Sequence, residues 1–278
     1  MRRGLLPYAL RRLGEEPPFR IVSRALLKRL NVSVQTRARW DLSARPQYLL
    51  GLVAAAEQAR RQKLREIGVI EFGVAGGDGL VAMQKDAEDV ERETGIAIRV
   101  YGFDMGPAGL PEFIGDHRDH PDVWQPGDYP MDLDLLKARL MDRTTLIIGN
   151  LRDTVPTFGE LHRPPPIGFV SIDVDLYSST RAALQLFSTP GVEVLWHVPM
   201  YFDDIEFIFN HRFGGELLAI DEFNAKNQSV KIDRWYGVRN DRPFADRSYL
   251  DKMFVAHDLV SVSGARPERS IGILPLRN

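Results

Sequence analysis

The chain has 278 residues, 44% hydrophobic and 27% charged, with 23 glycines and 18 prolines, values that exclude collagen-like, coiled-coil and wholly disordered proteins. Its formal net charge of −2 hides a change of sign, because residues 1–65 carry 15 basic and 4 acidic side chains while residues 66–278 carry 21 and 34. The absence of cysteine excludes disulfides, thiolate nucleophiles, zinc–thiolate sites and iron–sulfur clusters.

Residues 1–65 are predicted to form a basic helical arm or cap. Apolar side chains recur at helical spacing around Leu26, and again from Tyr48 onward in a helix that is expected to run to about Lys63. An Arg-rich, acid-poor segment also occurs in transit peptides, nucleic-acid-binding arms and membrane-surface helices. The simplest interpretation is an arm that packs on the acidic body or on a second subunit. We therefore expect a homo-oligomer and no nucleic-acid partner.

The amino-terminal apolar stretch is interrupted by Pro7 and closed by Arg11, which makes it too short for the hydrophobic region of a signal peptide. No segment approaches the roughly 18 consecutive apolar residues of a membrane span. These two observations predict a soluble, cytoplasmic protein.

From residue 66 the pattern changes to strands that alternate with helices, and residues 66–278 are expected to form one domain. Such alternation implies right-handed crossovers and a mostly parallel sheet, which is an α/β fold. The last strands are joined only by loops, so they are expected to form an antiparallel edge. The predicted strands are 67–74, 97–103, 145–148, 167–172, 192–198, 229–233 and 253–260, and the predicted helices are 80–90, 131–140, 178–187 and 206–225.

A glycine-rich segment, Glu71-Phe-Gly-Val-Ala-Gly-Gly77, lies between the first strand of this body and its helix. Glycines in this place let a ligand lie against the backbone and leave helix N–H groups free. The spacing differs from G-x-G-x-x-G, and Glu71 stands where a dinucleotide site usually has an apolar residue. The acidic residue suits a ligand with a cationic amino group, whereas the alternative is an ordinary glycine turn.

Asp104 ends the strand 97–103. A carboxylate at the tip of the second strand is where α/β nucleotide-binding proteins hold the ribose hydroxyls. The alternative role is that of a turn residue before Gly106.

Two further acidic groups follow predicted strands. Asp173 and Asp175 come directly after the strand 167–172, and on an extended chain their side chains would face the same way. Alternatively, either Asp175 or Ser178 is the N-cap of the next helix. The carboxyl ends of parallel strands are where open α/β sheets place their sites.

Asp203 and Asp204 are adjacent carboxylates, which repel each other and call for a cation if both project into a cleft. Together with Asp173 they supply three oxygen donors, a set that suits Mg²⁺ or Ca²⁺ rather than zinc. A bare Asp-Asp pair is alternatively a solvated turn. The six histidines show no H-x-x-x-H pattern, but His197 or His211 is expected to lie within reach of the cleft.

In this order the motifs resemble class I S-adenosylmethionine (SAM)-dependent methyltransferases. More narrowly they resemble the macrocin O-methyltransferase group, which methylates sugar hydroxyls of macrolide antibiotics. The matching segments are E-x-G-V-x-x-G at 71–77, G-F-D at 102–104 with G-L-P at 109–111, N-L-R-D-T-V-P at 150–156, and D-x-D-L-Y-x-S-T at 173–180 with D-D at 203–204.

The resemblance implies a Rossmann-like methyltransferase sheet, mostly parallel with an antiparallel edge, and methyl transfer to a hydroxyl of a small molecule, such as a glycosyl group of a natural product. It implies SAM and Mg²⁺ as cofactors. Asp173 would also accept the hydroxyl proton, with His197 or His211 as the alternative base. The implied cofactor residues are Glu71, Gly73, Gly76 and Gly77 for the methionine part, Asp104 for the ribose and Asn150 for the adenine, and the implied metal ligands are Asp173, Asp203 and Asp204.

The chain departs from the group's pattern in two places. The segment 190–205 lacks the usual G-G-Y-x-x-x-D-D-Y, and the segment 105–130 is longer, with Trp124 and Tyr129, and is predicted to be a substrate lid. One alternative is a nicotinamide-dependent oxidoreductase, which Glu71, the glycine spacing and the absence of Tyr-x-x-x-Lys disfavour. The other is a non-catalytic protein on a methyltransferase fold.

Overall fold

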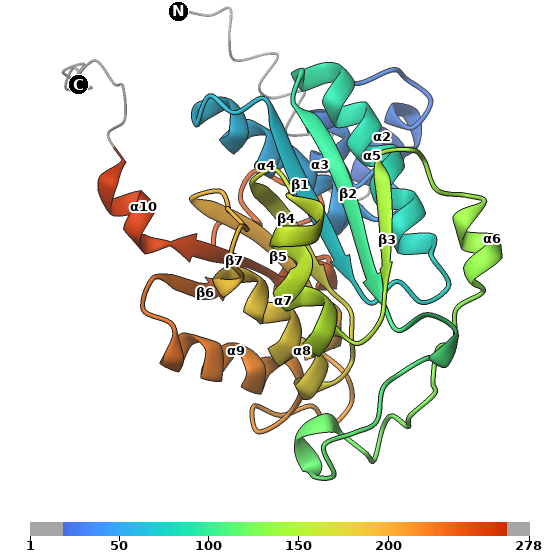
Figure 1. Cartoon of the computed structure of the whole chain (residues 1–278). Coiled ribbons are helices and arrows are strands. Elements are labelled where there is room, and N and C mark those ends of the chain that lie inside the picture. The colour runs from blue at the N-terminus through green and yellow to red at the C-terminus, as the bar shows by residue number, and fades with distance from the viewer. Residues whose placement is uncertain (1–18, 266–278) are drawn as a thin grey trace, which may run out of the picture.

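The computed structural model of the chain describes residues 19–265, which are built around one seven-stranded sheet of order β3-β2-β1-β4-β5-β7-β6 (Figure 1). Strands β1 to β5 run parallel, and β7 is antiparallel to both β5 and β6. The predicted α/β fold with an antiparallel edge is therefore confirmed. The strands are β1 Glu66–Phe72, β2 Ala97–Asp104, β3 Thr144–Ile148, β4 Ile167–Ile172, β5 His197–Phe202, β6 Val230–Arg234 and β7 Met253–Asp258.

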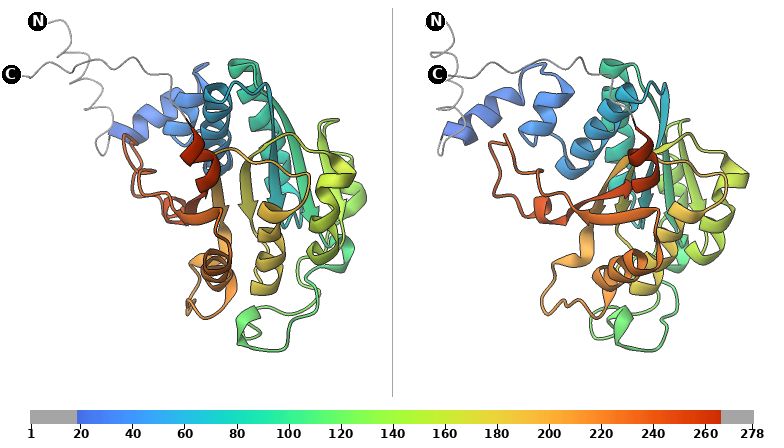
Figure 2. Two further views of the ribbon diagram at one scale, coloured as in Figure 1. Left: turned by 60° about the vertical axis from the view of Figure 1, so that its left-hand side comes forward. Right: turned by 90° about the vertical axis from the view of Figure 1, so that its left-hand side faces the viewer.

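Helices cover both faces of this sheet (Figures 1 and 2). Helices α4 and α5 pack together on one face, and α7, α8 and α9 pack in sequence on the other. Each crossover buries one side of its helix against strands that are themselves buried, as a parallel sheet requires. The α-helices are α2 Phe19–Leu27, α3 Val34–Arg39, α4 Pro46–Arg61, α5 Asp78–Thr94, α6 Leu133–Lys137, α7 Leu151–His162, α8 Tyr177–Ala183, α9 Gly215–Lys226 and α10 Leu259–Gly264.

Three features differ from the predicted elements. Helix α7 was not predicted, because Pro156 lies inside it and removes one N–H donor; the burial of Leu151, Val155 and Phe158 along one face stabilises the helix nevertheless. The predicted strand 192–198 is wrong in position, since β5 begins only at His197.

Strand β5 was misplaced because its own sequence contains Pro199, which disfavours a strand, while Val192 and Val194 just before it alternate as strand residues do. Residues 198–202 are all buried between neighbouring strands, and this tertiary packing decides the register. The helix expected over 206–225 likewise begins only at Gly215.

The arm joins the body partly through helix α4, which contacts β1, β4 and β5 and buries nine of its residues. Residues 1–18 of the predicted arm lie outside the described residues, and the division at residue 65 stays a prediction. None of the helices within residues 19–265 has the length and hydropathy that a membrane crossing requires.

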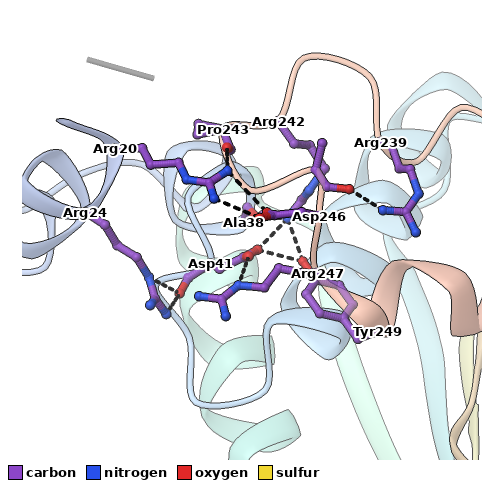
Figure 3. A network of polar contacts seen from close by, with 11 residues as sticks. Arg20, Arg24, Ala38, Asp41, Arg239, Arg242, Pro243, Asp246, Arg247 and Tyr249 are labelled. Atoms are coloured by element: carbon purple, nitrogen blue, oxygen red, sulfur yellow. Dashed lines mark hydrogen bonds and ion pairs between the residues drawn. The ribbon is translucent and has the colours of Figure 1, made fainter. Parts of the chain in front are cut away.

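A buried carboxylate ties the arm to the segment 239–249 (Figure 3). The Asp41 side chain is 1% exposed, and its Oδ1 accepts hydrogen bonds from Arg242 Nη2 at 2.5 Å and the Tyr249 hydroxyl at 2.6 Å. Arg247 Nε lies 3.6 Å from Asp41 Oδ2, and Arg24 donates to the Asp41 carbonyl at 2.6 Å. The buried carboxylate of the arm thus pairs with basic side chains from near the other end of the described chain.

Replacing Arg242 by methionine is expected to lower the free energy of unfolding by about 1–3 kcal/mol, because the buried Asp41 carboxylate keeps only its bond from Tyr249 and the distant Arg247. Arg247→Met is the matched control, since the Arg247 side chain is 44% exposed and its loss should change the stability by less than about 1 kcal/mol. Urea unfolding followed by circular dichroism measures both. Equal effects of the two substitutions would contradict the role given to burial.

Candidate functional site

A cavity of about 410 Å³ opens at the carboxyl ends of β1, β2, β4 and β5. The segment 105–131, green in Figure 1, loops out beyond these strand ends. Every residue that the sequence singled out for cofactor or metal binding lines this one cavity. These residues are Glu71, Gly73, Gly76, Gly77, Asp104, Asn150, Asp173, Asp203 and Asp204.

The glycine turn between β1 and α5 has a conformation that only glycine fits at two positions. Gly73 has φ +84°, and a Cβ there would lie 1.6 Å from the Asp173 carbonyl oxygen. Gly77 has φ +86° and precedes α5 without a side-chain cap, so the first N–H groups of the helix are free of a side-chain partner. At Gly76 a Cβ would meet nothing within 4 Å. The turn therefore presents bare backbone to open space in the cavity.

Glu71 is the last but one residue of β1 and is 2% exposed. Its Oε1 accepts a hydrogen bond from the Tyr48 hydroxyl at 2.6 Å, and Tyr48 in turn accepts one from Ser171 at 3.1 Å. Its Oε2 is buried and has no hydrogen-bond partner within residues 19–265. Burial raises the pKa of Glu71 to about 8, and the nearby charge of Asp173 adds to this effect. A buried carboxyl group with one unbonded oxygen suits a cationic hydrogen-bond donor.

Asp104 at the end of β2 holds the glycine turn. Its Oδ2 accepts from the backbone N–H groups of Val74 at 2.8 Å and Ala75 at 2.9 Å, and its Oδ1 accepts from Gly106 at 2.6 Å. Since each carboxylate oxygen has two lone pairs, Oδ1 still has room for one further donor. Asn150 caps α7 by accepting from the Arg152 N–H at 3.0 Å.

Asp173, Asp203 and Asp204 converge from the ends of β4 and β5. One carboxylate oxygen of each lies within 4.8 Å of the others. Burial, followed by the charges of Asp203 and Asp204, raises the pKa of Asp173 to about 8. Burial and Asp203 together raise the pKa of Asp204 to about 6. The three oxygens fit a hard divalent cation, which would relieve this repulsion.

Two residues that support this cluster were missed in the sequence. Lys252 Nζ lies 3.4 Å from Asp203 Oδ1 and also donates to the Asp203 carbonyl. Glu216, in the first turn of α9, is buried, and its Oε2 accepts from the Asp204 N–H at 3.0 Å. Neither residue belongs to a sequence motif. The fold alone brings them to the cluster, Lys252 from the antiparallel edge of the sheet and Glu216 from helix α9.

Asp175 also lines the cavity, although its backbone is not extended as expected. It has φ +61°, and its N–H donates to Asp204 Oδ2 at 3.2 Å. The Trp124 indole donates to the Asp175 carbonyl at 3.3 Å, so the segment 105–131 reaches the cavity edge. Neither Asp175 nor Ser178 caps α8 with its side chain; instead the Asp119 side chain accepts from the Ser178 N–H at 2.8 Å.

The histidines do not line the cavity. His197 begins β5 and lies six residues before Asp203, about 20 Å away along a strand, and its Nδ1 lies 2.9 Å from Nδ1 of His257. His211 packs against the rings of His120 and Phe213. The expectation that either histidine reaches the cavity is therefore wrong.

Arg45 is a cavity residue that the sequence did not single out, because it lies in the basic arm among many other arginines. It comes just before α4, and its charge lowers the pKa of both Glu71 and Asp173, opposing their burial. It brings a positive charge to the acidic end of the cavity.

Comparison with known proteins identifies the fold. No family model and no curated protein matches the chain. Among solved structures, the O-methyltransferase NovP matches with a TM-score of 0.52 and 15% identity over 77% of this chain and 79% of that one. The calicheamicin methyltransferase CalS11 matches with a TM-score of 0.47 and 24% identity over 63% of this chain and 69% of that one. The chain has the Rossmann-like fold of class I methyltransferases.

Proposed function

We propose that this protein is a SAM-dependent O-methyltransferase that acts on a hydroxyl of a small molecule, a glycosyl group of a natural product, with the help of Mg²⁺. One observation carries the proposal: a single cavity joins a bare glycine turn and a buried, half-partnered Glu71 to a cluster of three carboxylates. A dinucleotide site would not need either acidic group. The fold of NovP, an O-methyltransferase, supports the same activity.

The cofactor end of the cavity suits an amino acid. Glu71 Oε2 would accept a hydrogen bond from the ammonium group of the methionine part, and Arg45 would pair with its carboxylate. The backbone of Gly73, Gly76 and Gly77 would lie against that part. Asp104 would take a ribose hydroxyl and Asn150 would lie at the adenine. SAM supplies an electrophilic methyl group, and the protein has to place an activated hydroxyl in line with it.

The cation end of the cavity suits the acceptor. Asp173, Asp203 and Asp204 would hold Mg²⁺, and the bound cation lowers the pKa of a coordinated hydroxyl. Asp173 would accept the hydroxyl proton, because it would be both a ligand of the cation and a neighbour of the coordinated hydroxyl. The deprotonated oxygen would then take the methyl group of SAM, so that a C–O bond forms as the methyl–sulfur bond breaks and S-adenosylhomocysteine leaves.

The remaining parts of the chain take supporting roles in this proposal. Residues 66–278 would be the catalytic domain, with 105–130 as the substrate lid whose Trp124 and Tyr129 line the cavity. The basic arm, residues 1–65, would cover the cleft or dock on the acidic body of the same or a neighbouring subunit. A cytoplasmic homo-oligomer stays our prediction.

Isothermal titration with S-adenosylhomocysteine, the demethylated product, and with NAD tests the proposal. We expect S-adenosylhomocysteine to bind with one site per chain and NAD not to bind. Binding of NAD alone would instead support the oxidoreductase, and binding of neither would favour a non-catalytic protein.

Gly76→Val is expected to weaken S-adenosylhomocysteine binding about tenfold or more without unfolding the protein, because the new side chain enters open space at the cavity wall. Gly264→Val is the matched control: a Cβ there also meets nothing within 4 Å, but Gly264 lies in α10 and does not line the cavity. Thermal unfolding and titration measure both variants. If Gly76→Val bound S-adenosylhomocysteine as tightly as the control does, the cofactor would not lie against this turn.

A further inference from the structure

A second cavity, of about 330 Å³, adjoins the proposed active site and is lined by three arginines. Arg118 comes from the segment 105–131, Arg152 from the first turn of α7, and Arg181 from α8. Three guanidinium groups around one hollow form a site of positive charge that the proposed reaction does not use.

The two cavities share a wall. Leu151 and Ser179 line the active-site cavity. Their neighbours in the chain, Arg152 and Ser178, line the second cavity. Residues adjacent in the chain therefore line two neighbouring cavities, and an acceptor held in both would have to reach past only these residues.

Arg118 is held in place before any ligand arrives. It pairs with Asp116, with Nη2 to Oδ2 at 2.7 Å, and its guanidinium carbon lies 5.0 Å from the centre of the Tyr177 ring. Arg152 and Arg181 differ from it, because their side chains make no hydrogen bond or ion pair with any residue in the range 19–265. Two of the three charges are thus available to a ligand.

Two acidic groups nearby are already engaged. Asp119 is buried and accepts from the N–H groups of Ile114 at 2.9 Å and Ser178 at 2.8 Å. Glu222, which Arg181 influences electrostatically, has its carboxylate bonded to Lys226 at 2.7 Å. The amino end of α7, where Arg152 lies, adds the positive end of a helix dipole.

We propose that this second cavity binds a phosphate or diphosphate group of the acceptor, so that the acceptor is a phosphorylated or nucleotide-linked sugar. The inference rests on the proposed methyl transfer and names its substrate class. Arginine forks match the geometry of phosphate oxygens, and two arginines without partners suit a group of charge about −2. The acceptor's sugar hydroxyls would then lie in the first cavity, beside the three carboxylates.

The test is the binding of pyrophosphate and of UDP-glucose, measured by isothermal titration on the full chain. Arg152→Gln with Arg181→Gln should weaken both about tenfold or more, and addition of Arg118→Gln should weaken them further. The matched control is Arg60→Gln, Arg61→Gln and Arg65→Gln together, which removes three exposed charges at the opposite, amino end of β1. This control should bind both probes as the unchanged protein does.

Absence of pyrophosphate binding, or equal weakening in the control, would overturn the inference. Pyrophosphate binding without UDP-glucose binding would also overturn it, because the cavity would then hold free phosphate and not part of an acceptor. S-adenosylhomocysteine binding is measured in every variant and should not change. If the unchanged protein did not bind S-adenosylhomocysteine, the proposed function would be refuted. The two phosphate probes would still show whether the second cavity binds phosphate.

Discussion

Replacing Asp203 and Asp204 together by asparagine is expected to lower kcat/KM for methyl transfer about 1,000-fold, because the cluster then keeps only Asp173 as a charged ligand. The same change should abolish Mg²⁺ binding. Removing Mg²⁺ from the unchanged protein with a chelator should have a similar effect on turnover, and added Mg²⁺ should restore it.

The loss should not come from unfolding. Burial and Asp203 raise the pKa of Asp204 to about 6, which means that the charged cluster opposes folding when no cation is present. Neutral asparagines remove that repulsion, so the variant should be at least as stable as the unchanged protein, and it should still bind S-adenosylhomocysteine. Thermal unfolding without Mg²⁺ measures the first point and titration the second.

Asp175→Asn is the matched control. Asp175 lines the same cavity, and burial raises its pKa to about 8, but it lies outside the three-carboxylate cluster. We expect its replacement to leave Mg²⁺ binding within about tenfold of the original. Turnover that is insensitive both to chelation and to the loss of Asp203 and Asp204 would remove the cation from the mechanism.

The sequence predicted the sheet and the residues around the cavity because both follow from local patterns. A short, β-branched apolar run such as 167–172 between turn residues indicates a buried strand, and a polar residue directly after such a strand lies at its carboxyl end. Asp104 and Asp173 could be placed in one cavity for that reason alone. Their expected binding roles stay predictions.

What the sequence could not reveal depends on contacts between distant residues. Lys252 and Glu216 reach the cluster through β7 and α9, whose positions depend on the antiparallel edge. Arg45 is one of many arginines in the arm until the fold brings it beside Glu71. Helix α7 was hidden by Pro156, which tertiary burial overrides.

Replacing Glu71 by glutamine is expected to weaken S-adenosylhomocysteine binding about 10- to 100-fold at neutral pH, through loss of one charge-assisted hydrogen bond. The glutamine side chain would keep nearly the same volume and could still accept the bond from Tyr48. The fold should therefore survive, and the effect should appear in the affinity for the ligand.

The pH dependence of this variant separates a charge effect from a packing effect. Burial raises the pKa of Glu71 from 4.5 to about 8, so the folded protein binds one more proton than the unfolded chain between these values. The stability that Glu71 contributes is thus complete below pH 4.5 and is lost as the pH rises towards 8. Without ligand, the free energy of unfolding of the unchanged protein should decrease between about pH 5 and pH 8. In Glu71→Gln this decrease should be smaller, by on the order of 3 kcal/mol.

Ligand binding should lower the pKa of Glu71, whereas burial without ligand raises it. An ammonium group beside Glu71 Oε2 stabilises the carboxylate, so binding at neutral pH should release about one proton from the unchanged protein and none from Glu71→Gln. Titrations in two buffers of different ionisation enthalpy measure that proton directly. If the unchanged protein bound S-adenosylhomocysteine without releasing a proton, and Glu71→Gln bound it equally well, the amino group would lie elsewhere. The buried, half-partnered carboxylate at the end of β1 would then be a structural residue of the Tyr48–Ser171 chain and not a cofactor ligand.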